Sequence, residues 1–190
     1  MTFKRLWQSF RLCTIKNPTA RADYLRKIKV FNAIGSDCTI QRRKIPLYAN
    51  LIRIGNNVRI ASGVSFLTHD AIHRVLNRMN EKKGGFQERV GCIEIGNNVF
   101  IGASTRIMYD TRIGSNVIIG TGSVVTKDIP DNSVAAGVPA KVIGTFDDFV
   151  ERYARLTNYP AELTPRGQVV SDELAKLLWK AFDEKHNPQR

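Results

Sequence analysis

The chain has 190 residues, a formal net charge of +12 at pH 7 and a hydrophobic content of 43%. This length allows one domain with a sizeable core and small appendages. No apolar run approaches the roughly eighteen residues of a membrane span, and the N-terminus lacks the apolar stretch and small-residue cleavage site of a signal peptide. The three cysteines, Cys13, Cys38 and Cys92, are widely spaced, so they predict neither a disulfide framework nor a metal site. We therefore expect a reduced, cytoplasmic protein.

Residues 2–30 predict one or two helices, with a break near Asn17 and Pro18. This segment carries eight Lys or Arg residues against a single acid, Asp23. An apolar stripe recurs in it at helical spacing and consists of Phe3, Leu6, Trp7 and Phe10. Two interpretations remain open. The stripe packs on the following domain as a cap, or the basic segment binds an anionic membrane surface, an anionic ligand or nucleic acid. We favour the cap, and no recognition motif supports nucleic-acid binding.

Between residues 54 and 142 an aliphatic residue returns at nearly every sixth position, usually beside a small residue. A period of six fits neither the helix repeat of about 3.6 nor the alternation of a strand. It predicts a parallel β-helix with about three short strands per turn, in which the aliphatic residues fill a narrow interior. Glycine, alanine and the pairs Asn56-Asn57 and Asn97-Asn98 suit the tight corners between strands.

The repeat is interrupted at residues 67–92, and the segment Thr68-His69-Asp70 lies where the interruption begins. An inserted loop of this length in an otherwise regular solenoid is usually functional. Its charged residues are Arg74, Arg78, Lys82, Lys83 and Arg89 against Asp70, Glu81 and Glu88.

Two more helices are predicted near the C-terminus. One begins at Thr145 with a capping box that ends at Asp148, and the other begins at Ser171 and runs past Trp179. The expected organisation is therefore a helical cap at residues 1–30, a β-helix at residues 31–144 with its insertion at 67–92, and a helical extension at 145–190.

The run GSVVTKDIPDNSVAAGVPAKVI at residues 122–143 closely resembles the closing stretch of the hexapeptide-repeat acyltransferases. The resemblance covers roughly residues 30–156. It implies an all-β solenoid, a left-handed parallel β-helix with flanking helices, that uses acetyl-CoA and assembles as a homotrimer with active sites between subunits. Within that family, FLTHD at residues 66–70 is similar to the histidine-bearing segment of sugar O-acetyltransferases that act in surface polysaccharide pathways.

The resemblance implies transfer of an acetyl group from acetyl-CoA to a hydroxyl of a sugar, in capsule, O-antigen or exopolysaccharide biosynthesis. A neutral histidine suits the general base because its pKa lies near working pH, and His69 is the candidate; a structural loop histidine is the alternative. Asp70, His73 and Arg74 are expected to shape the acceptor pocket, where the excess positive charge of the insertion suits an acidic or diphosphate-linked sugar. Ordinary solvation explains these charges almost as well.

Two details of the site stay open. The group that orients His69 is Asp70, a backbone carbonyl or a residue of the facing subunit. His69 and His73 have a spacing that could bind zinc on a helix, but no third ligand completes the set, so no metal is predicted. Neither Cys38 nor Cys92 adjoins His69 in sequence, so direct transfer is expected rather than a covalent acyl-enzyme.

Residue by residue, the resemblance assigns the acetyl-CoA contacts to five positions. The backbones of Ala103 and Thr121 would line the pantetheine arm, Thr126 and Lys127 would lie toward the nucleotide, and Lys141 would lie near its phosphates. The alternative is that the first two are ordinary corner residues and the lysines ordinary surface residues.

Two other functions remain. An N-acetyltransferase of an amino sugar, or a xenobiotic acetyltransferase, would use the same scaffold. A non-catalytic β-helix scaffold is disfavoured by His69 and by the intact Thr126-Lys127 motif. The expected partners are further copies of the chain, a sugar or polysaccharide precursor, and, if the N-terminal segment is not only a cap, the inner membrane face.

Overall fold

The computed structural model describes residues 3–79, 85–156, 159–167 and 169–186. Three charged residues of the predicted insertion, Glu81, Lys82 and Lys83, lie outside these ranges. The chain forms two compact units, residues 1–149 and residues 150–190, and each is described by itself.

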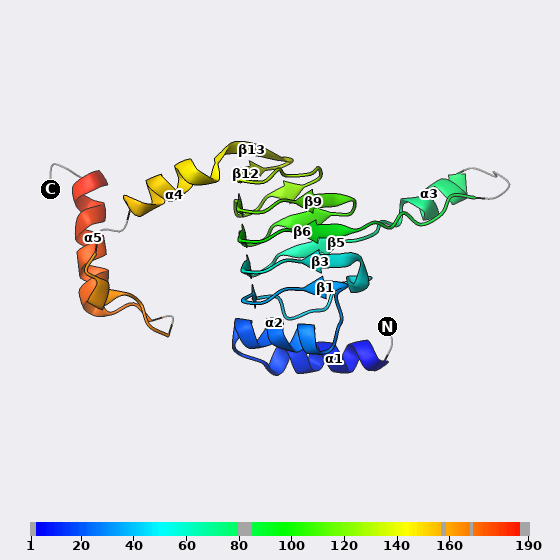
Figure 1. Cartoon of the computed structure of the whole chain (residues 1–190), viewed down its shortest axis with the longest axis horizontal. Helices are drawn as coiled ribbons and strands as arrows, with labels where there is room; N and C mark the ends of the chain where they lie inside the picture. The colour runs from blue at the N-terminus through cyan, green and yellow to red at the C-terminus, as the bar shows by residue number, and fades with distance from the viewer. Residues whose placement is uncertain (1–2, 80–84, 157–158, 168, 187–190) are drawn as a thin grey trace. The chain divides into compact units, whose positions relative to one another are not determined.

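The first unit is a parallel β-helix with three sheets (Figure 1). The first sheet has the order β1-β3-β6-β9, with β1 (Ala33–Ile34), β3 (Ile52–Ile54), β6 (Ile93–Ile95) and β9 (Thr111–Ile113). The second has the order β13-β12-β10-β7-β4-β2, with β2 (Thr39–Ile40), β4 (Val58–Ile60), β7 (Val99–Ile101), β10 (Val117–Ile119), β12 (Ser133–Gly137) and β13 (Ala140–Thr145). The third has the order β11-β8-β5, with β5 (Ser65–Leu67), β8 (Arg106–Met108) and β11 (Val124–Val125).

From β3 to β11, consecutive strands belong to different sheets, so each of these turns visits each sheet once, whereas β12 and β13 both belong to the second sheet. Strands of successive turns pair in parallel and place like residues over one another, for example Ile54 beside Ile95 and Ile60 beside Ile101. These aliphatic side chains are buried, because alternate residues of each short strand point into the interior. Among the named strands of the described residues, β12 and β13 alone pair antiparallel, at the last turn of the β-helix.

One corner of the β-helix is built by a ladder of asparagines. Asn57, Asn98, Asn116 and Asn132 all have left-handed backbone conformations, with φ between 53° and 57°. Each side-chain amide donates to the next side-chain oxygen, over 3.0 Å from Asn57 to Asn98, 2.9 Å from Asn98 to Asn116 and 2.8 Å from Asn116 to Asn132. The second residue of each predicted pair therefore makes the turn, since asparagine tolerates this conformation.

The N-terminal end of the β-helix is closed by α1 (Phe3–Thr14) and α2 (Pro18–Lys27). The Asn17 side chain caps α2, accepting from the backbone N–H groups of Thr19 and Ala20. Leu12 of α1 and Leu25 of α2 join the core. Arg21 is buried, and its guanidinium donates to the carbonyl of Ile40 over 2.7 Å.

The N-terminal apolar stripe does not pack on the β-helix, and the favoured interpretation was wrong on this point. Phe3, Leu6, Trp7 and Phe10 are 84%, 49%, 60% and 62% exposed. The opposite face of α1 makes the contacts: Leu12 is buried, and Arg5 donates to the carbonyl of Ile45 over 3.1 Å. An α-helix packs only one of its faces against a flat surface, and in α1 this is the face that carries Leu12.

The insertion leaves the β-helix after β5 and projects as an arm that carries α3 (Ile72–Met79) (Figure 1). Its two ends are held together at the exit. Gly91 N–H donates to the carbonyl of Thr68 over 3.0 Å, and Asp70 N–H donates to that of Arg89 over 3.1 Å. The short 3-10 helix η1 (Ala49–Leu51) precedes β3 on the turn below.

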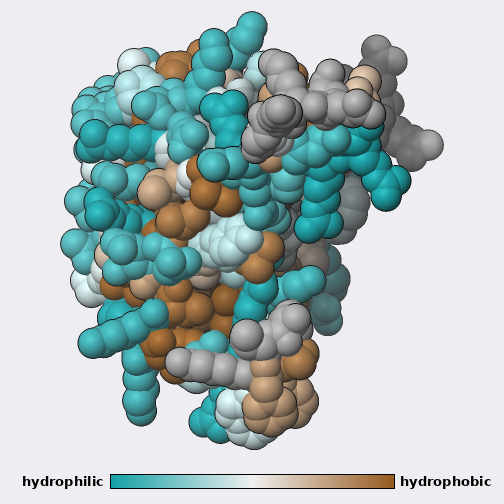
Figure 2. Space-filling view, turned by 90° about the vertical axis from the view of Figure 1, so that its right-hand side faces the viewer, coloured by the Kyte–Doolittle hydropathy of each residue, from teal (hydrophilic) through white to brown (hydrophobic). Residues whose placement is uncertain are grey.

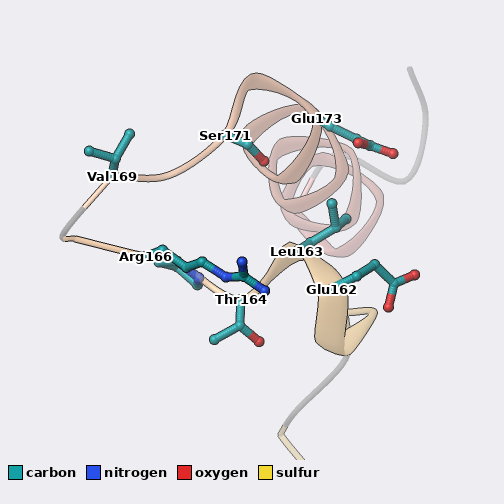
Figure 3. Close-up of a pocket in the computed structure, with 8 residues that line it drawn as sticks. Glu162, Leu163, Thr164, Arg166, Val169, Ser171 and Glu173 are labelled. Carbon is teal, nitrogen blue, oxygen red and sulfur yellow. The ribbon is translucent and has the colours of Figure 1, made fainter.

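The helix α4 (Phe146–Ala154) starts beyond β13, where Thr145 Oγ1 accepts from Asp148 N–H over 3.1 Å. The second unit contains the 3-10 helix η2 (Ala161–Leu163) and α5 (Asp172–His186). A pocket of about 370 Å³ lies between these two elements and is lined in part by Glu162, Arg166 and Glu173 (Figure 3). None of the predicted site residues lines it. Among the residues that the structure describes, no helix has the length and apolar character needed to cross a membrane.

Candidate active site

His69 lies just past the end of β5, where the chain turns from the β-helix into the insertion. Its backbone pairs antiparallel with Val90 on the returning strand of the arm. The ring is half-buried and meets Tyr48 edge-on, with ring centroids 5.2 Å apart and an interplanar angle of 77°. Its Nδ1 is buried and has no hydrogen-bond partner among the described residues. Burying a ring nitrogen without a hydrogen-bond partner costs free energy. We therefore expect a group outside the described residues to form a hydrogen bond with Nδ1.

The backbone before His69 is held by Thr68, which is fully buried. Thr68 Oγ1 donates to the carbonyl of Leu47 over 2.8 Å, which joins the exit of β5 to the segment before η1. The next residue of that segment, Tyr48, has a left-handed backbone conformation with φ of 49°. This conformation is unusual for an aromatic residue and marks a position held by its surroundings. Here it presents the Tyr48 ring to His69.

Asp70 is bound by two groups, neither of which is His69. Tyr109 Oη donates to Asp70 Oδ2 over 2.6 Å, and Ile72 N–H donates to Oδ1 over 3.0 Å at the start of α3. The hydrogen bond from Tyr109 is the main reason that the pKa of Asp70 lies below its ordinary value; the Ile72 N–H and the charges of Arg89 and His73 act in the same direction. The same bond raises the pKa of Tyr109. Asp70 thus holds the arm rather than the His69 ring.

The other two predicted acceptor residues lie on the arm. His73 is half-buried in the first turn of α3, and its Nδ1 is also buried without a partner among the described residues. Arg74 is exposed. The apolar face of α3, made of Ile72, Val75 and Met79, is exposed as well. In the described ranges, no three His, Cys, Asp or Glu residues are grouped so that they could hold a metal ion.

Three of the predicted cofactor residues gather at the corner between the second and third sheets. Gly122 N–H donates to the carbonyl of Ala103 over 2.8 Å, which places Thr121 on the turn directly above Ala103. A Cβ atom on Gly102 would lie 2.5 Å from the backbone nitrogen of Thr121, so the stacked turns leave no room for a side chain there. Lys141 on β13 pairs with Ala136 on β12. Ala136 stacks on Gly120, the residue before Thr121, so Lys141 lies at the same corner one turn later.

The remaining two cofactor residues lie at the other end of the third sheet. Thr126 and Lys127 are exposed and follow β11 directly. Because Val125 pairs with Ile107 and Ile107 pairs with Phe66, these residues lie at the edge where β5 leads into His69. One chain therefore brings Thr126 and Lys127 to the side of His69, and it separates them from Ala103 and Thr121 by about the length of a short strand.

The structure adds three residues that were not predicted, namely Tyr48, Arg89 and Tyr109. The Arg89 guanidinium lies 5.4 Å from the centroid of the Tyr109 ring. The sequence carries no signal for Tyr109, since Ile107 and Ile113 keep the six-residue spacing on either side of it. No signal marks Tyr48 either, and the sequence marks Arg89 only as one of the charges of the insertion.

The fold and the repeat agree with comparisons to known proteins. Residues 92–127 match the family described as bacterial transferase hexapeptide (six repeats). The chain is 40% identical over 134 residues to galactoside O-acetyltransferase of Escherichia coli K12, covering 65% of this chain and 62% of that protein. It is 38% identical over 144 residues to Protein CapG of Staphylococcus aureus, covering 74% of this chain and 80% of CapG.

Among solved structures, a galactoside acetyltransferase in complex with coenzyme A aligns with a TM-score of 0.56 and 26% identity. The alignment covers 89% of this chain and 88% of that one. The chain spans less than two thirds of the E. coli relative but four fifths of CapG. The six-residue repeat, the stacked β-helix and these similarities together show that the chain belongs to the hexapeptide-repeat acetyltransferase family.

Proposed function

We propose that the protein transfers an acetyl group from acetyl-CoA directly to a hydroxyl of a sugar, with His69 as the general base. The observation that carries the proposal is the position of His69: a half-buried imidazole against Tyr48, at the exit from a hexapeptide-repeat β-helix. The relatives of this chain include a galactoside O-acetyltransferase, and a similar solved structure contains coenzyme A.

The proposed proton path follows from the burial of the ring. Since Nδ1 of His69 is buried, Nε2 is the nitrogen left to meet the acceptor. Nε2 removes the hydroxyl proton as the acceptor oxygen attacks the thioester carbonyl, forming the new C–O bond. As the C–S bond breaks, the leaving thiolate takes that proton back from the imidazolium, so the products are an acetyl ester, free CoA and neutral His69. A positive imidazolium also stabilises the developing negative charge.

Acetyl-CoA is the donor substrate, and two groups of residues are proposed to hold it. The stacked backbones at Ala103 and Thr121 form a smooth corner suited to an extended arm, and the space beside Gly122 is open. Lys141 at this corner, and Lys127 with Thr126 at the His69 end, supply positive charge for phosphates. Because these two groups of residues lie apart within a single chain, we propose that each active site combines residues from two neighbouring copies of a homotrimer.

Two observations support assembly of the proposed trimer. Nδ1 of His69 has no partner among the described residues, and the apolar face of α3 is exposed. A facing subunit would supply the group that orients His69 and would cover α3. The β-helix is proposed to be left-handed, as the family resemblance implies, and the enzyme to work in the cytoplasm, where acetyl-CoA is available.

The acceptor is proposed to be a precursor of a surface polysaccharide such as capsule, O-antigen or exopolysaccharide. Asp70 anchors the start of the arm next to His69, and His73 follows in the first turn of α3. The exposed Arg74 offers a positive charge to an acidic or diphosphate-linked sugar.

Release of free CoA, measured with a thiol reagent, tests the proposal. The purified protein is given acetyl-CoA with galactosides, maltose, diphosphate-linked sugars or amino sugars, and mass spectrometry locates the acetyl group. An O-acetylated sugar supports the proposal. Acetylation of amino groups alone would assign the protein to the N-acetyltransferases instead, and absence of turnover with every acceptor class would support a non-catalytic scaffold.

A further inference from the structure

The exposed apolar stripe of α1 is not used by the proposed function. Phe3, Trp7 and Phe10 recur at positions i, i+4 and i+7, so they share one face of the helix. The rings of Trp7 and Phe10 are stacked, with centroids 6.0 Å apart. Each of the three side chains is at least 60% exposed. Large aromatic side chains gathered on one exposed face mark an interaction surface.

This aromatic face points away from the β-helix. Leu12, which is buried, lies about 180° around the helix from Phe3 at 100° per residue, and Arg5 on the same side is bonded to Ile45. The packed face therefore anchors α1 to the rigid β-helix and holds the aromatic face outward.

The charge around α1 identifies the occupant. The helix contains no acidic residue, and Asp23, the one acid of residues 1–30, is paired with Arg26 over 2.7 Å. Arg11 lies beside the stripe at helical spacing and is exposed, as are Lys16, Lys27 and Lys29. An apolar stripe with Arg11 beside it, in a segment rich in exposed cations, fits the interface of an anionic bilayer, where aromatic rings enter the headgroup region and cations meet the phosphates. A second copy of this chain presents the same positive charge, so charge complementarity disfavours it.

We propose that α1 docks the protein on an anionic membrane surface, with the Phe3-Trp7-Phe10 face inserted into the interface. The docked end of the molecule carries a groove of about 440 Å³, and its lining includes Arg5 and Gln8 of α1 together with Ile45 and Tyr48. Figure 2 views the side of the first unit from which the arm projects, and apolar side chains gather in the lower half of this face.

The groove connects the docking helix to the candidate active site, because Tyr48 lines the groove and also contacts His69. Docking would thus bring the His69 end of the β-helix toward lipid headgroups. This consequence rests on the proposed function, and it identifies the acceptor class as sugars carried on membrane lipid. Docking itself does not depend on catalysis.

Co-sedimentation with vesicles of phosphatidylethanolamine and phosphatidylglycerol tests the docking. The variant Phe3→Ser/Trp7→Ser/Phe10→Ser removes the aromatic face, and it should keep the fold because Leu12 is untouched. Trp179→Ser/Phe182→Ser is the matched control, since these exposed aromatic side chains also contact each other, on α5. Wild-type and control proteins should bind at low salt and dissociate as salt rises. The α1 variant should bind at least about tenfold more weakly, because each buried aromatic ring contributes strongly to partitioning.

Fluorescence supplies a second readout. The chain has two tryptophans, so Trp179→Phe leaves Trp7 as the single reporter. Its emission should shift to shorter wavelength when these vesicles are added. Absence of binding at low salt, equal binding to neutral phosphatidylcholine vesicles, or full binding by the α1 variant would overturn the proposal. A blue-shifted emission that depends on protein concentration without vesicles would also overturn it, in favour of a contact between copies.

The same proteins separate this inference from the proposed function. The α1 variant should acetylate a water-soluble sugar at the wild-type rate, because its three changes lie on the face turned away from the β-helix. If neither the wild type nor the α1 variant acetylates any acceptor, the proposed function fails. The vesicle-binding measurements then still decide whether α1 docks on the membrane.

Discussion

Tyr109 and Asp70 are joined by a hydrogen bond of 2.6 Å, although they are 39 positions apart in the sequence. Tyr109 belongs to the regular β-helix, just after β8, whereas Asp70 is the first residue of the insertion beyond His69. Since the Asp70 carboxylate also accepts from Ile72 N–H at the start of α3, one carboxylate ties the base of the arm to the β-helix. This contact therefore acts with the backbone bonds at the exit of the arm to fix the position of the arm relative to His69.

Tyr109→Phe should leave the β-helix intact and loosen the arm. The phenyl ring keeps its packing, but Asp70 loses the bond that anchors it. We expect faster hydrogen exchange in α3 and a raised KM for the acceptor, with a smaller change in kcat. Tyr24→Phe is the control, because the Tyr24 hydroxyl forms no hydrogen bond within the described residues. An acceptor KM unchanged in Tyr109→Phe would remove this contact from the architecture of the site.

The same contact predicts a pH window for the order of the arm. The pKa of Asp70 is lowered, so its contribution is present above the ordinary aspartate value of about 3.9 and is lost as pH falls through the lower folded value. The pKa of Tyr109 is raised, so its contribution is present below the ordinary tyrosine value of about 10 and is lost as pH rises through the higher folded value. Hydrogen exchange in α3 should therefore be slow and pH-independent between these limits, after correction for intrinsic exchange rates. An additional opening of α3 near pH 7 would contradict the assignment.

His69→Ala should lower kcat by about 10²–10⁴-fold, the usual contribution of a general base. The affinity for acetyl-CoA, measured by calorimetry, should stay nearly unchanged, since the ring is not proposed to bind the donor. His186→Ala at the exposed end of α5 is the matched control. If His69→Ala retains more than about a tenth of the wild-type kcat, His69 is not the base.

Lys127→Ala and Lys141→Ala should each raise the KM for acetyl-CoA more than they lower kcat, because charge that holds phosphates acts on binding. The defect should shrink as salt rises, since salt screens exposed charges. Lys176→Ala, an exposed lysine of α5, should have no such effect. Wild-type KM in both variants at low salt would exclude these lysines from the donor site.

Asn98→Ala should destabilise the β-helix by about 1–3 kcal/mol, because it breaks two hydrogen bonds of the asparagine ladder and forces alanine into a left-handed conformation. Asn98→Gly tolerates the conformation and loses only the bonds, so its loss should be smaller. Chemical denaturation measures both. Equal losses in the two variants would show that backbone conformation contributes little at this corner.

The sequence by itself determined the repeating part of the molecule. The six-residue period predicted the parallel β-helix because one aliphatic side chain per short strand must point into a narrow interior. The break in that period predicted where His69 leaves the β-helix, and the motif at residues 122–143 predicted the family. Each of these signals is local, so it can be read without knowing which distant residues meet.

Only the tertiary structure decided what surrounds His69 and which way α1 faces. Tyr48 meets His69, and Tyr109 meets Asp70, because the number of residues in each turn and in the insertion sets which corners stack. The spacing of Phe3, Trp7 and Phe10 shows an apolar face but not its partner. Which face of α1 packs depends on which of its side chains meet the surface of the β-helix. Leu12, on the opposite side of α1 from the aromatic face, makes that contact.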